Sequence, residues 1–327
     1  MNQRHLLRLV ALALPALWLA APAAAQDFPP KKAVSLVVGF APGGAADAAA
    51  RLIAKKLGEN IGQTVVVENK AGAGGNIAHQ QVANGPEDGS VLLFGSIGPL
   101  TIAPHMMKVG YDPFKDLAAI SGGVHFPNVL VVNAASGIKT VADVVAMAKK
   151  DAGSVTYAST GNGSASHLAG ELFSQRAGVE MTHVPYRGGA PAMQDLLGGR
   201  FTGYFAAPPT ALPHIETGKL TPIATTGLTR PSYLPNVPTV AEAGFPGFQA
   251  LNWYAFVAPG KTPVTLLDRW NVEIVKVLKD PGVIDALNKH GLSTHPTTRA
   301  ELTDFMRKES SLWGTIVRER KITASGS

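Results

Sequence analysis

Short apolar runs alternate with helical patterns along most of this chain, and that alternation restricts the fold more than any other feature of the sequence. Several runs are apolar at consecutive positions rather than at every second position, which suits strands of a parallel sheet buried on both faces. The expected strands cover residues 34–40, 64–68, 91–95, 129–133, 155–159, 183–185, 202–206 and 222–225.

Helices are expected between these strands, where apolar residues recur every three to four positions behind a capping residue. Thr140 precedes one such stripe, and Thr262 precedes another as a cap followed by Pro263 at the first helical position. Thr298 and Glu301 have the spacing of a capping box that opens a long C-terminal helix. Strands that alternate with helices predict an α/β fold.

The first 25 residues have the order of a secretory signal peptide. Arg4 and Arg8 precede an apolar run over residues 9–19, and small residues follow it up to Ala25. This run is shorter than the roughly 20 residues that span a bilayer. We therefore expect cleavage after Ala25, export to the periplasm and no membrane anchor. The chain has no cysteine, so it has neither a lipid-anchor cysteine nor a disulfide.

Basic residues are scattered along the chain rather than gathered in one segment. The formal net charge is +6, which includes Arg4 and Arg8 of the expected signal peptide. The short basic clusters at residues 31–32, 149–150 and 318–321 are typical of solvated faces. A nucleic-acid-binding protein normally concentrates lysine and arginine on one face. We therefore expect a soluble monomer that binds neither nucleic acid nor lipid.

Two glycine-rich turns stand where a strand ends and a helix begins, which is the position at which α/β sheets bind ligands. The first turn contains Phe40, Ala41, Gly43 and Gly44, and Asp47 follows in the first turn of the helix. A helix N-terminus has unpaired N–H groups and about half a positive charge, so it attracts anions. Asp47 most simply complements the helix dipole.

The second turn consists of Thr160, Gly161, Asn162, Gly163 and Ser164, and it also leads from a strand into a helix. A single glycine-rich turn would indicate only tight-turn geometry. Two such turns on complementary parts of the chain favour one anion site that both of them form, with free N–H groups as its donors.

The sequence lacks the usual signatures of cofactor binding and catalysis. The second turn has no third glycine of a dinucleotide fingerprint, and no Lys-Ser/Thr pair follows the first turn as in a phosphate-binding loop. No nucleophile elbow occurs, and no two histidines have the spacing of a zinc helix. We expect no cofactor, no metal and no enzymatic activity. The remaining enzymatic alternative is an exported hydrolase that uses Ser164 with His167 or His183.

Sequence segments spread in order across the chain carry a resemblance to a known family. They include VVGFAPGG at residues 37–44, VENKAGAGGN at residues 67–76, HVPYRG at residues 183–188 and LPNVPTVAEAG at residues 234–244. With these segments the chain resembles the substrate-binding receptors of the tripartite tricarboxylate transporters, also called the Bug family. The resemblance implies a two-lobed, type II periplasmic-binding-protein fold, with two open, mostly parallel sheets flanked by helices and a ligand cleft between them.

The same resemblance implies how the lobes divide the chain and which residues complete the site. Residues 26–130 would form the first lobe, residues 131–226 the second, and residues 227–327 would return to the first. The ligand-binding residues that the resemblance adds are Gly75, Asn76, Ser96, Tyr186, Arg187 and Ala206. For Arg187 two roles stay open, a direct contact with the ligand or an exposed structural or steering charge.

The function that the resemblance implies is capture of a small carboxylate by lobe closure. The ligand would be a di- or tricarboxylate, an acidic amino acid or an aromatic acid, and the partner would be the permease subunits of a tripartite tricarboxylate transporter. An orphan receptor that signals to a membrane sensor kinase is the alternative.

Overall fold

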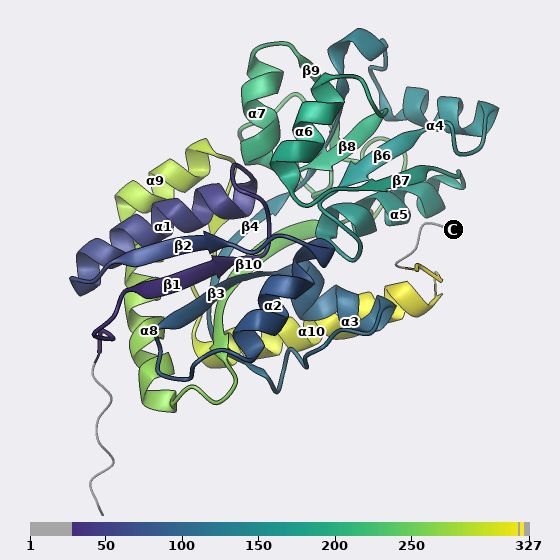
Figure 1. The fold of residues 1–327 in the computed structure, drawn as a ribbon. Helices are drawn as coiled ribbons and strands as arrows, with labels where there is room; N and C mark the ends of the chain where they lie inside the picture. The colour runs from purple at the N-terminus through teal and green to yellow at the C-terminus, as the bar shows by residue number, and fades with distance from the viewer. Residues whose placement is uncertain (1–27, 320, 324–327) are drawn as a thin grey trace, which may run out of the picture.

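The computed structural model describes residues 28–319 and 321–323 and contains two β-sheets with helices packed on their faces (Figure 1). The expected signal peptide and its cleavage after Ala25 lie outside these residues. We call the six-stranded sheet with its helices the first lobe, and the five-stranded sheet with its helices the second lobe. The expected two-lobed α/β fold is confirmed. No helix within the described residues is both long and apolar enough to cross a membrane.

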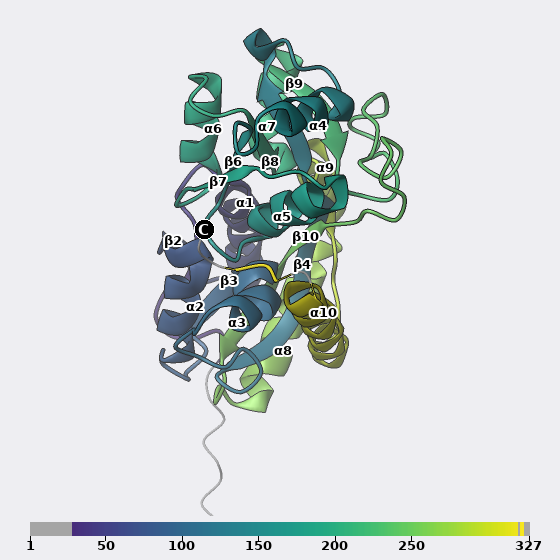
Figure 2. The ribbon, with the colours of Figure 1, turned by 90° about the vertical axis from the view of Figure 1, so that its right-hand side faces the viewer.

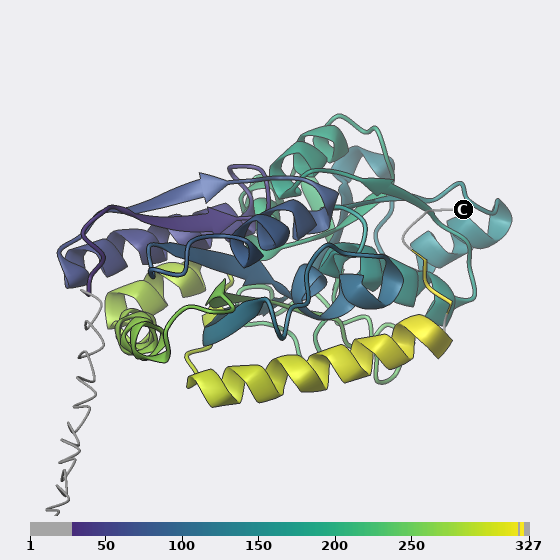
Figure 3. The ribbon, with the colours of Figure 1, turned by 60° about the horizontal axis from the view of Figure 1, so that its bottom comes forward.

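The first lobe has the strand order β11-β4-β10-β3-β1-β2. Its strands are β1 (Val34–Val38), β2 (Val65–Asn69), β3 (Val91–Ser96), β4 (Leu117–Pro127), β10 (Leu251–Pro259) and β11 (Ser293–Thr294). Its helices are α1 (Ala45–Ile61), α2 (Asn76–Ala83), α3 (Ala103–Met106), α8 (Val264–Leu278), α9 (Pro281–Lys289) and α10 (Arg299–Glu319), with the short turns η1 (Ala73–Gly75) and η2 (Gly98–Ile102). Figure 3 shows α10 along one side of the molecule, where it packs on β4, η2 and α3.

The second lobe has the strand order β7-β6-β8-β5-β9. Its strands are β5 (Val129–Asn133), β6 (Thr156–Ser159), β7 (Thr182–Pro185), β8 (Gly203–Ala206) and β9 (Leu220–Thr225). Its helices are α4 (Val141–Lys150), α5 (Ala165–Ala177), α6 (Gly189–Leu197) and α7 (Pro208–Glu216), with the short turn η3 (Ala134–Ser136). Figure 2 shows this lobe above the first, with α5 near the boundary between them.

All eight expected strands are present, but both sheets are mixed rather than mostly parallel. β1 pairs in parallel with β2 and β3, and β6 pairs in parallel with β7 and β8. The antiparallel pairs come from β4, β5 and β10. The sequence reasoning missed β4, β10 and β11. β10 returns to the first sheet from the second lobe and therefore enters it antiparallel to its neighbours β3 and β4.

Consecutive apolar residues in β5 bury both faces of the second sheet. Leu130 and Val132 belong to the hydrophobic core that includes α4 and α5 residues, whereas Val129 and Val131 belong to the core beside α6 and α7. Successive side chains of a strand point to opposite faces, so a strand covered on both faces is apolar at every position. This explains why the strand could be found from sequence without a period-two pattern.

Two of the three expected helix caps are confirmed. The Thr140 hydroxyl accepts a hydrogen bond from the N–H of Asp143 at the start of α4. Thr298 and Glu301 form the expected reciprocal pair at the start of α10, with distances of 2.8 and 3.2 Å. The expected cap at Thr262 is wrong. Pro263 itself occupies the N-cap position of α8, which has no side-chain cap.

Two connections join the two lobes in the described part of the chain, Asn128 and residues 226–250, and hydrogen bonds tie them to one another. Asn128 alone separates β4 from β5. Its N–H donates to the Thr226 hydroxyl at 2.9 Å, and the Thr226 N–H donates back to the Asn128 carbonyl at 2.9 Å. The Thr226 hydroxyl in turn donates to the carbonyl of Ala250, just before β10, at 2.7 Å. This arrangement fixes the joining segments as one unit.

Candidate ligand-binding site

A cavity of about 450 Å³, its mouth included, lies between the two lobes. The residues that line it are Phe40, Gly44, Ala45, Ala46, Ser96, Ile97, Asn128, Thr160, Ser164, Ala165, Ser166, Gly189, Tyr204, Phe205, Ala207, Thr210, Asn252 and Tyr254. None of these lining residues has a side chain with a formal charge.

The N-terminus of α1 forms part of the first lobe's wall of the cavity. The helix begins at Ala45, behind Gly44, which has no side chain to cap it. Ala45 and Ala46 both line the cavity. The first N–H groups of a helix have no intrahelical acceptor, and no described residue accepts a hydrogen bond from the N–H of Ala45 or Ala46. The two donors are therefore available to a ligand.

The N-terminus of α5 faces the same cavity from the second lobe. The helix begins at Ala165 behind Ser164, whose hydroxyl accepts a hydrogen bond from the N–H of His167 at 3.3 Å. Ala165 and Ser166 line the cavity, and their N–H groups have no acceptor among the described residues. The cavity thus has unpaired backbone donors and the positive end of a helix dipole on each side.

The first glycine-rich turn is held by a charged cluster behind the cavity. The Asp47 carboxylate accepts hydrogen bonds from the Gly43 N–H and the Arg51 Nε, each at 3.0 Å, and from the Asn69 Nδ2 at 2.9 Å. Asn69 also donates to the carbonyl of Phe40 at 3.0 Å. The cluster ties both ends of the turn to α1 and β2. It uses the Gly43 N–H, which is then not free for a ligand.

Asp47 stays ionised in this setting. Burial raises the pKa of its carboxyl, but the hydrogen bonds from Arg51, Gly43 and Asn69 outweigh burial, and the pKa lies below its ordinary value. Asp47 is not among the residues that line the cavity, and its carboxylate accepts hydrogen bonds from Gly43, Arg51 and Asn69.

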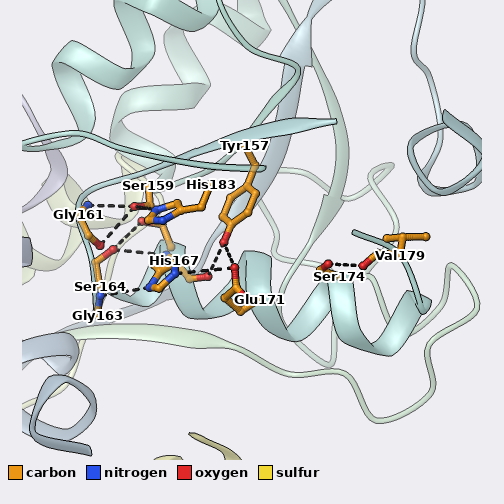
Figure 4. Close-up of polar contacts among 11 residues, drawn as sticks. Tyr157, Ser159, Gly161, Gly163, Ser164, His167, Glu171, Ser174, Val179 and His183 are labelled. Atoms are coloured by element: carbon orange, nitrogen blue, oxygen red, sulfur yellow. Dashed lines mark hydrogen bonds and ion pairs between the residues drawn. The ribbon is translucent and has the colours of Figure 1, made fainter. Parts of the chain in front are cut away.

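The second turn is held by neutral side chains beneath it (Figure 4). The Gly161 N–H donates to the Ser159 hydroxyl at 3.0 Å, and the Gly163 N–H donates to Nδ1 of His167 at 3.2 Å. The expectation that these glycines offer free N–H groups is therefore wrong, and the same holds for Gly43. In both lobes the free amides lie slightly further along the chain, in the first turn of the helix.

Two histidines, His167 buried and His183 half-buried, stack beside the second turn, as Figure 4 shows. The rings of His167 and His183 are nearly parallel, with their centroids 4.0 Å apart, and Nε2 of His183 is 2.5 Å from the Ser159 hydroxyl. Burial lowers the pKa of His167 to about 3 and that of His183 to about 4. Both rings are therefore neutral at physiological pH. Because Nδ1 of His167 accepts from Gly163, its proton lies on Nε2.

These contacts do not form the nucleophile and base of a hydrolase. The Ser164 hydroxyl contacts the Ser166 hydroxyl at 3.2 Å and accepts the backbone N–H of His167. His183 contacts Ser159 instead, and Nδ1 of His167 already accepts from Gly163. Neither imidazole hydrogen-bonds the Ser164 hydroxyl, as a nucleophilic serine requires.

The two lobes meet through backbone at a seam of glycines beside the cavity. The Ala41 N–H donates to the Arg187 carbonyl across the lobes at 3.1 Å. A Cβ on Gly98 would lie 2.6 Å from the Gly163 carbonyl oxygen, and a Cβ on Gly161 would lie 2.7 Å from the Gly74 Cα. Contacts this close require glycine, so the structure is a closed arrangement in which each lobe covers the other's turn.

Five of the sixteen residues expected to bind the ligand line the cavity: Phe40, Gly44, Ser96, Thr160 and Ser164. Six more of the expected residues belong to the two glycine-rich turns or to the seam between the lobes: Ala41, Gly43, Asp47, Gly161, Asn162 and Gly163. Their contacts position the turns rather than form the wall of the cavity.

The other five expected residues lie outside the cavity wall. Gly75 and Asn76 stand at the start of α2, where the Asn76 side chain bonds Ala73 and Tyr111. The Tyr186 hydroxyl donates to Asp195 at 2.8 Å. The Arg187 side chain is exposed. Ala206 lies on β8 between two lining residues, Phe205 and Ala207.

Sequence reasoning missed several polar residues of the cavity wall. They are Asn128, Ser166, Tyr204, Thr210, Asn252 and Tyr254. Asn128 and Asn252 interrupt or begin apolar strand runs, and a polar residue within such a run is a signal that could have indicated them. Tyr204 is typical of an ordinary strand residue and Tyr254 lies on β10, which was not expected, so the sequence carried no signal for either tyrosine.

No cluster of three or more histidine, aspartate or glutamate side chains that could hold a metal ion occurs in the part of the chain that the structure describes.

Comparison with known proteins relates this chain to solute-binding receptors. Residues 49–322 match the model of the "Tripartite tricarboxylate transporter family receptor". The chain is 37% identical, over 90% of its length and 88% of the relative's, to the "UPF0065 protein in tcbD-tcbE intergenic region" of Pseudomonas sp. (strain P51). It is 34% identical to "Protein BugT" of Bordetella pertussis, over 98% of both chains.

Solved structures of similar fold include one periplasmic binding protein and two proteins with a carboxylate bound. The structure of the periplasmic binding protein BugD matches with a TM-score of 0.85 at 31% identity, over 90% of this chain and 99% of that one. Rpa4515 of R. palustris with adipate matches with a TM-score of 0.87 at 32% identity, over 91% and 99% of the two chains. MatC from Rhodopseudomonas palustris with bound malate matches with a TM-score of 0.84 at 29% identity, over 88% and 99%.

Proposed function

This chain belongs to the tripartite tricarboxylate transporter receptor family, whose members are solute-binding receptors and not enzymes, and we propose that it captures a small carboxylate in the periplasm and delivers it to the transporter's permease. The observation that carries the proposal is the pair of helix N-termini, α1 from one lobe and α5 from the other, that open on one uncharged cavity.

The carboxylate would be held by backbone donors rather than by an ion pair. Ala45 and Ala46 supply N–H groups from the first lobe, and Ala165 and Ser166 supply them from the second. Each hydrogen bond to a charged group contributes roughly 1.5–3 kcal/mol. A carboxylate that bridges the two helices binds more tightly when the lobes are closed, and this difference in affinity shifts the population toward the closed form.

In this mechanism the two lobes move as two bodies about the tied segments at Asn128, Thr226 and Ala250. The expected division put residues 26–130 and 227–327 in one body and residues 131–226 in the other. Val129 and Leu130 belong to β5 of the second sheet, so the first boundary would lie at Asn128. The closed form would be the one that the permease recognises. Relatives of known structure bind adipate or malate, which supports a carboxylate as the ligand class.

Proline substitution at the first helical position tests whether backbone amides hold the ligand. Ala165→Pro removes one free N–H in a position where proline suits the helix, because Ser164 before it is already extended, with φ −77° and ψ 163°. We expect binding of the tightest acid from a panel of di-, tri- and aromatic carboxylates to weaken at least tenfold by calorimetry. The melting temperature of the free protein should stay within a few degrees of wild type.

Val264→Pro is the matched control, because Val264 is the exposed first residue of α8, far from the cavity wall, and follows an extended residue. It should leave binding unchanged. A panel in which no carboxylate binds or raises the melting temperature would contradict the proposed function, since a ligand at a hundredfold excess over its Kd adds about 2.7 kcal/mol to stability. Unchanged binding in Ala165→Pro would contradict the backbone site.

A further inference from the structure

Two asparagines stand where the joining segments meet the cavity. Asn128 separates β4 from β5, Asn252 lies on β10, and both side chains line the cavity although they are only 1% and 8% exposed. Asn252 Nδ2 is 3.5 Å from Asn128 Oδ1. The other atoms of the pair, Asn128 Nδ2 and Asn252 Oδ1, have no hydrogen-bond partner among the described residues. One buried donor and one buried acceptor, on two residues that line the cavity, are therefore unpaired.

This outcome does not depend on how the two amides are oriented. The nitrogen and oxygen of an asparagine side chain are interchanged by a flip. If both amides were flipped, Asn128 would donate to Asn252, and the cavity would receive the Asn128 oxygen and the Asn252 nitrogen. Flipping only one amide would place two nitrogens or two oxygens against each other, which is unfavourable. In either favourable arrangement the pair offers one donor and one acceptor.

Backbone hydrogen bonds hold both asparagines in the segments that join the lobes. Asn128 is held through its N–H and carbonyl by Thr226 at 2.9 Å each. Asn252 lies opposite Phe126 in the β10–β4 ladder. The pair therefore belongs to the joining segments, whereas the helix N-termini approach from the two lobes.

A ligand group that satisfies the pair must both accept and donate a hydrogen bond. A hydroxyl group or a primary amide does both, whereas a carboxylate only accepts and would leave the asparagine oxygen facing an anion. A buried polar atom without a partner costs about 1–3 kcal/mol. Ser96, whose buried hydroxyl also lacks a partner and lines the cavity, can turn its proton to suit either group.

We propose that Asn128 and Asn252 select carboxylates that carry a hydroxyl or amide group over acids in which a hydrogen or a second carboxylate takes its place. The proposal rests on the proposed function, since it presumes that the helix N-termini bind a carboxylate in the same cavity. It adds that Asn128 and Asn252, in the segments that join the lobes, recognise the hydroxyl or amide group of that ligand.

Matched pairs of acids test the selection by calorimetry on the mature protein. The pairs are L- or D-malate against succinate, citrate against tricarballylate, and mandelate against phenylacetate. The hydroxy acid of at least one pair should bind at least tenfold more tightly than its partner that lacks the hydroxyl. Succinamate against succinate separates the two neutral groups, since tight binding of succinamate would indicate an amide ligand.

The variant Asn252→Leu replaces the amide with an apolar side chain of similar size. It should reduce the preference within the pair to less than threefold, mainly by weakening the hydroxy acid. Thr225→Val is the matched control, because the buried Thr225 hydroxyl also lacks a partner but does not line the cavity. Its preference should equal that of the wild type. Circular dichroism and melting temperature show whether each variant folds.

Equal or tighter binding of the acids without a hydroxyl or amide would overturn the proposal while leaving carboxylate capture intact. A preference that persists in both Asn252→Leu and Asn128→Leu would also overturn it. Failure of every acid in the panel to bind would instead remove the proposed function, and this inference with it.

Discussion

The two glycine-rich turns have the same role in the site, but side chains of different chemistry hold them in place. Each follows a strand and places the first amides of a helix at the cavity, but the first turn is held by an ionised carboxylate and the second by neutral hydroxyls and imidazoles. Asp47, Ser159 and His167, which hold the glycine amides of the turns, are not among the residues that line the cavity. The comparison shows that the wall can stay uncharged whichever chemistry lies behind it.

Burial explains why the two turns differ. Asp47 is balanced by Arg51, whose side chain is 53% exposed, so the charge of the pair reaches solvent. The histidines lie beneath the second turn, with His167 1% exposed, where an ionised group would lose its hydration without a full partner. A neutral imidazole can accept the glycine N–H there at no such cost.

The docking of the second turn on the first lobe is the contact whose loss we expect to have the largest effect. Gly98 meets this turn, and the Cβ of Gly98→Ala would lie 2.6 Å from the Gly163 carbonyl oxygen and 3.1 Å from the Ser164 Cα. Because these are backbone atoms, the lobes must separate. We expect ligand affinity to fall at least a hundredfold, or about 2.7 kcal/mol, by calorimetry. Scattering should show no compaction with ligand.

The control for this substitution is Gly198→Ala at the end of α6. Gly198 has ordinary helical angles, φ −80° and ψ 0°, and a Cβ there would stand 3.5 Å from its nearest neighbour. It should bind like the wild type. Gly98→Ala that still compacts with ligand would show that the lobes close in some other way than the structure has them.

Low pH should affect the stability contributed by the neutral second turn and by the charged first turn differently. The pKa of His167 is about 3 in the folded protein, against about 6.5 when unfolded, so below pH 6.5 the unfolded chain binds more protons and stability falls. Between pH 6.5 and 4.5 this histidine should remove about 2 kcal/mol from the free energy of unfolding. His167→Asn, which keeps an acceptor for the Gly163 N–H, should flatten the measured pH dependence by that amount.

Asp47→Asn is the comparison for the charged turn. The lowered pKa of Asp47 means that its contribution is complete above its unfolded value of 3.8 and is lost only as pH falls below it. Denaturant titrations at several pH values should therefore give Asp47→Asn a lower free energy of unfolding than the wild type. The dependence of that free energy on pH should be the same as in the wild type between pH 6.5 and 4.5. A pH dependence of stability that changes in Asp47→Asn but not in His167→Asn would show that Asp47, and not His167, causes the loss in this pH range.

Arg187 is expected to matter least, although it stands beside the first turn. The side chain is exposed, and the contact it makes across the lobes uses its carbonyl, which accepts from the Ala41 N–H at 3.1 Å. Arg187→Ala keeps that carbonyl, so ligand affinity should fall by less than about tenfold, or 1.4 kcal/mol. A thousandfold loss would indicate a direct guanidinium contact with the ligand.

Local pattern was sufficient for most of the fold. The eight expected strands are present, and in the inner strands β5 and β8 the apolar run buries both faces of the sheet. The caps at Thr140 and Thr298 depend only on residues three positions apart. β4 and β10 were missed, since glycine, serine and asparagine interrupt their apolar runs. Their antiparallel entry also depends on the chain's return from the second lobe.

The candidate site, like the fold, was only partly predictable from local sequence pattern. The turns and the start of the two helices could be read from glycines that follow strands, and Phe40, Gly44, Ser96, Thr160 and Ser164 line the cavity. Which amides are free could not be read, because that depends on acceptors that the fold supplies.

The sequence by itself determined that two helices begin directly after two strands, and hence that unpaired amides gather at two strand ends. The tertiary structure decided that the two ends meet at one cavity. It also decided that Ser159 and His167 take the glycine amides of the second turn, and that Asn128 and Asn252 meet. The physical reason is range: a helix start is set by neighbours in the chain, whereas the partner of a buried polar atom is set by segments that only folding brings together.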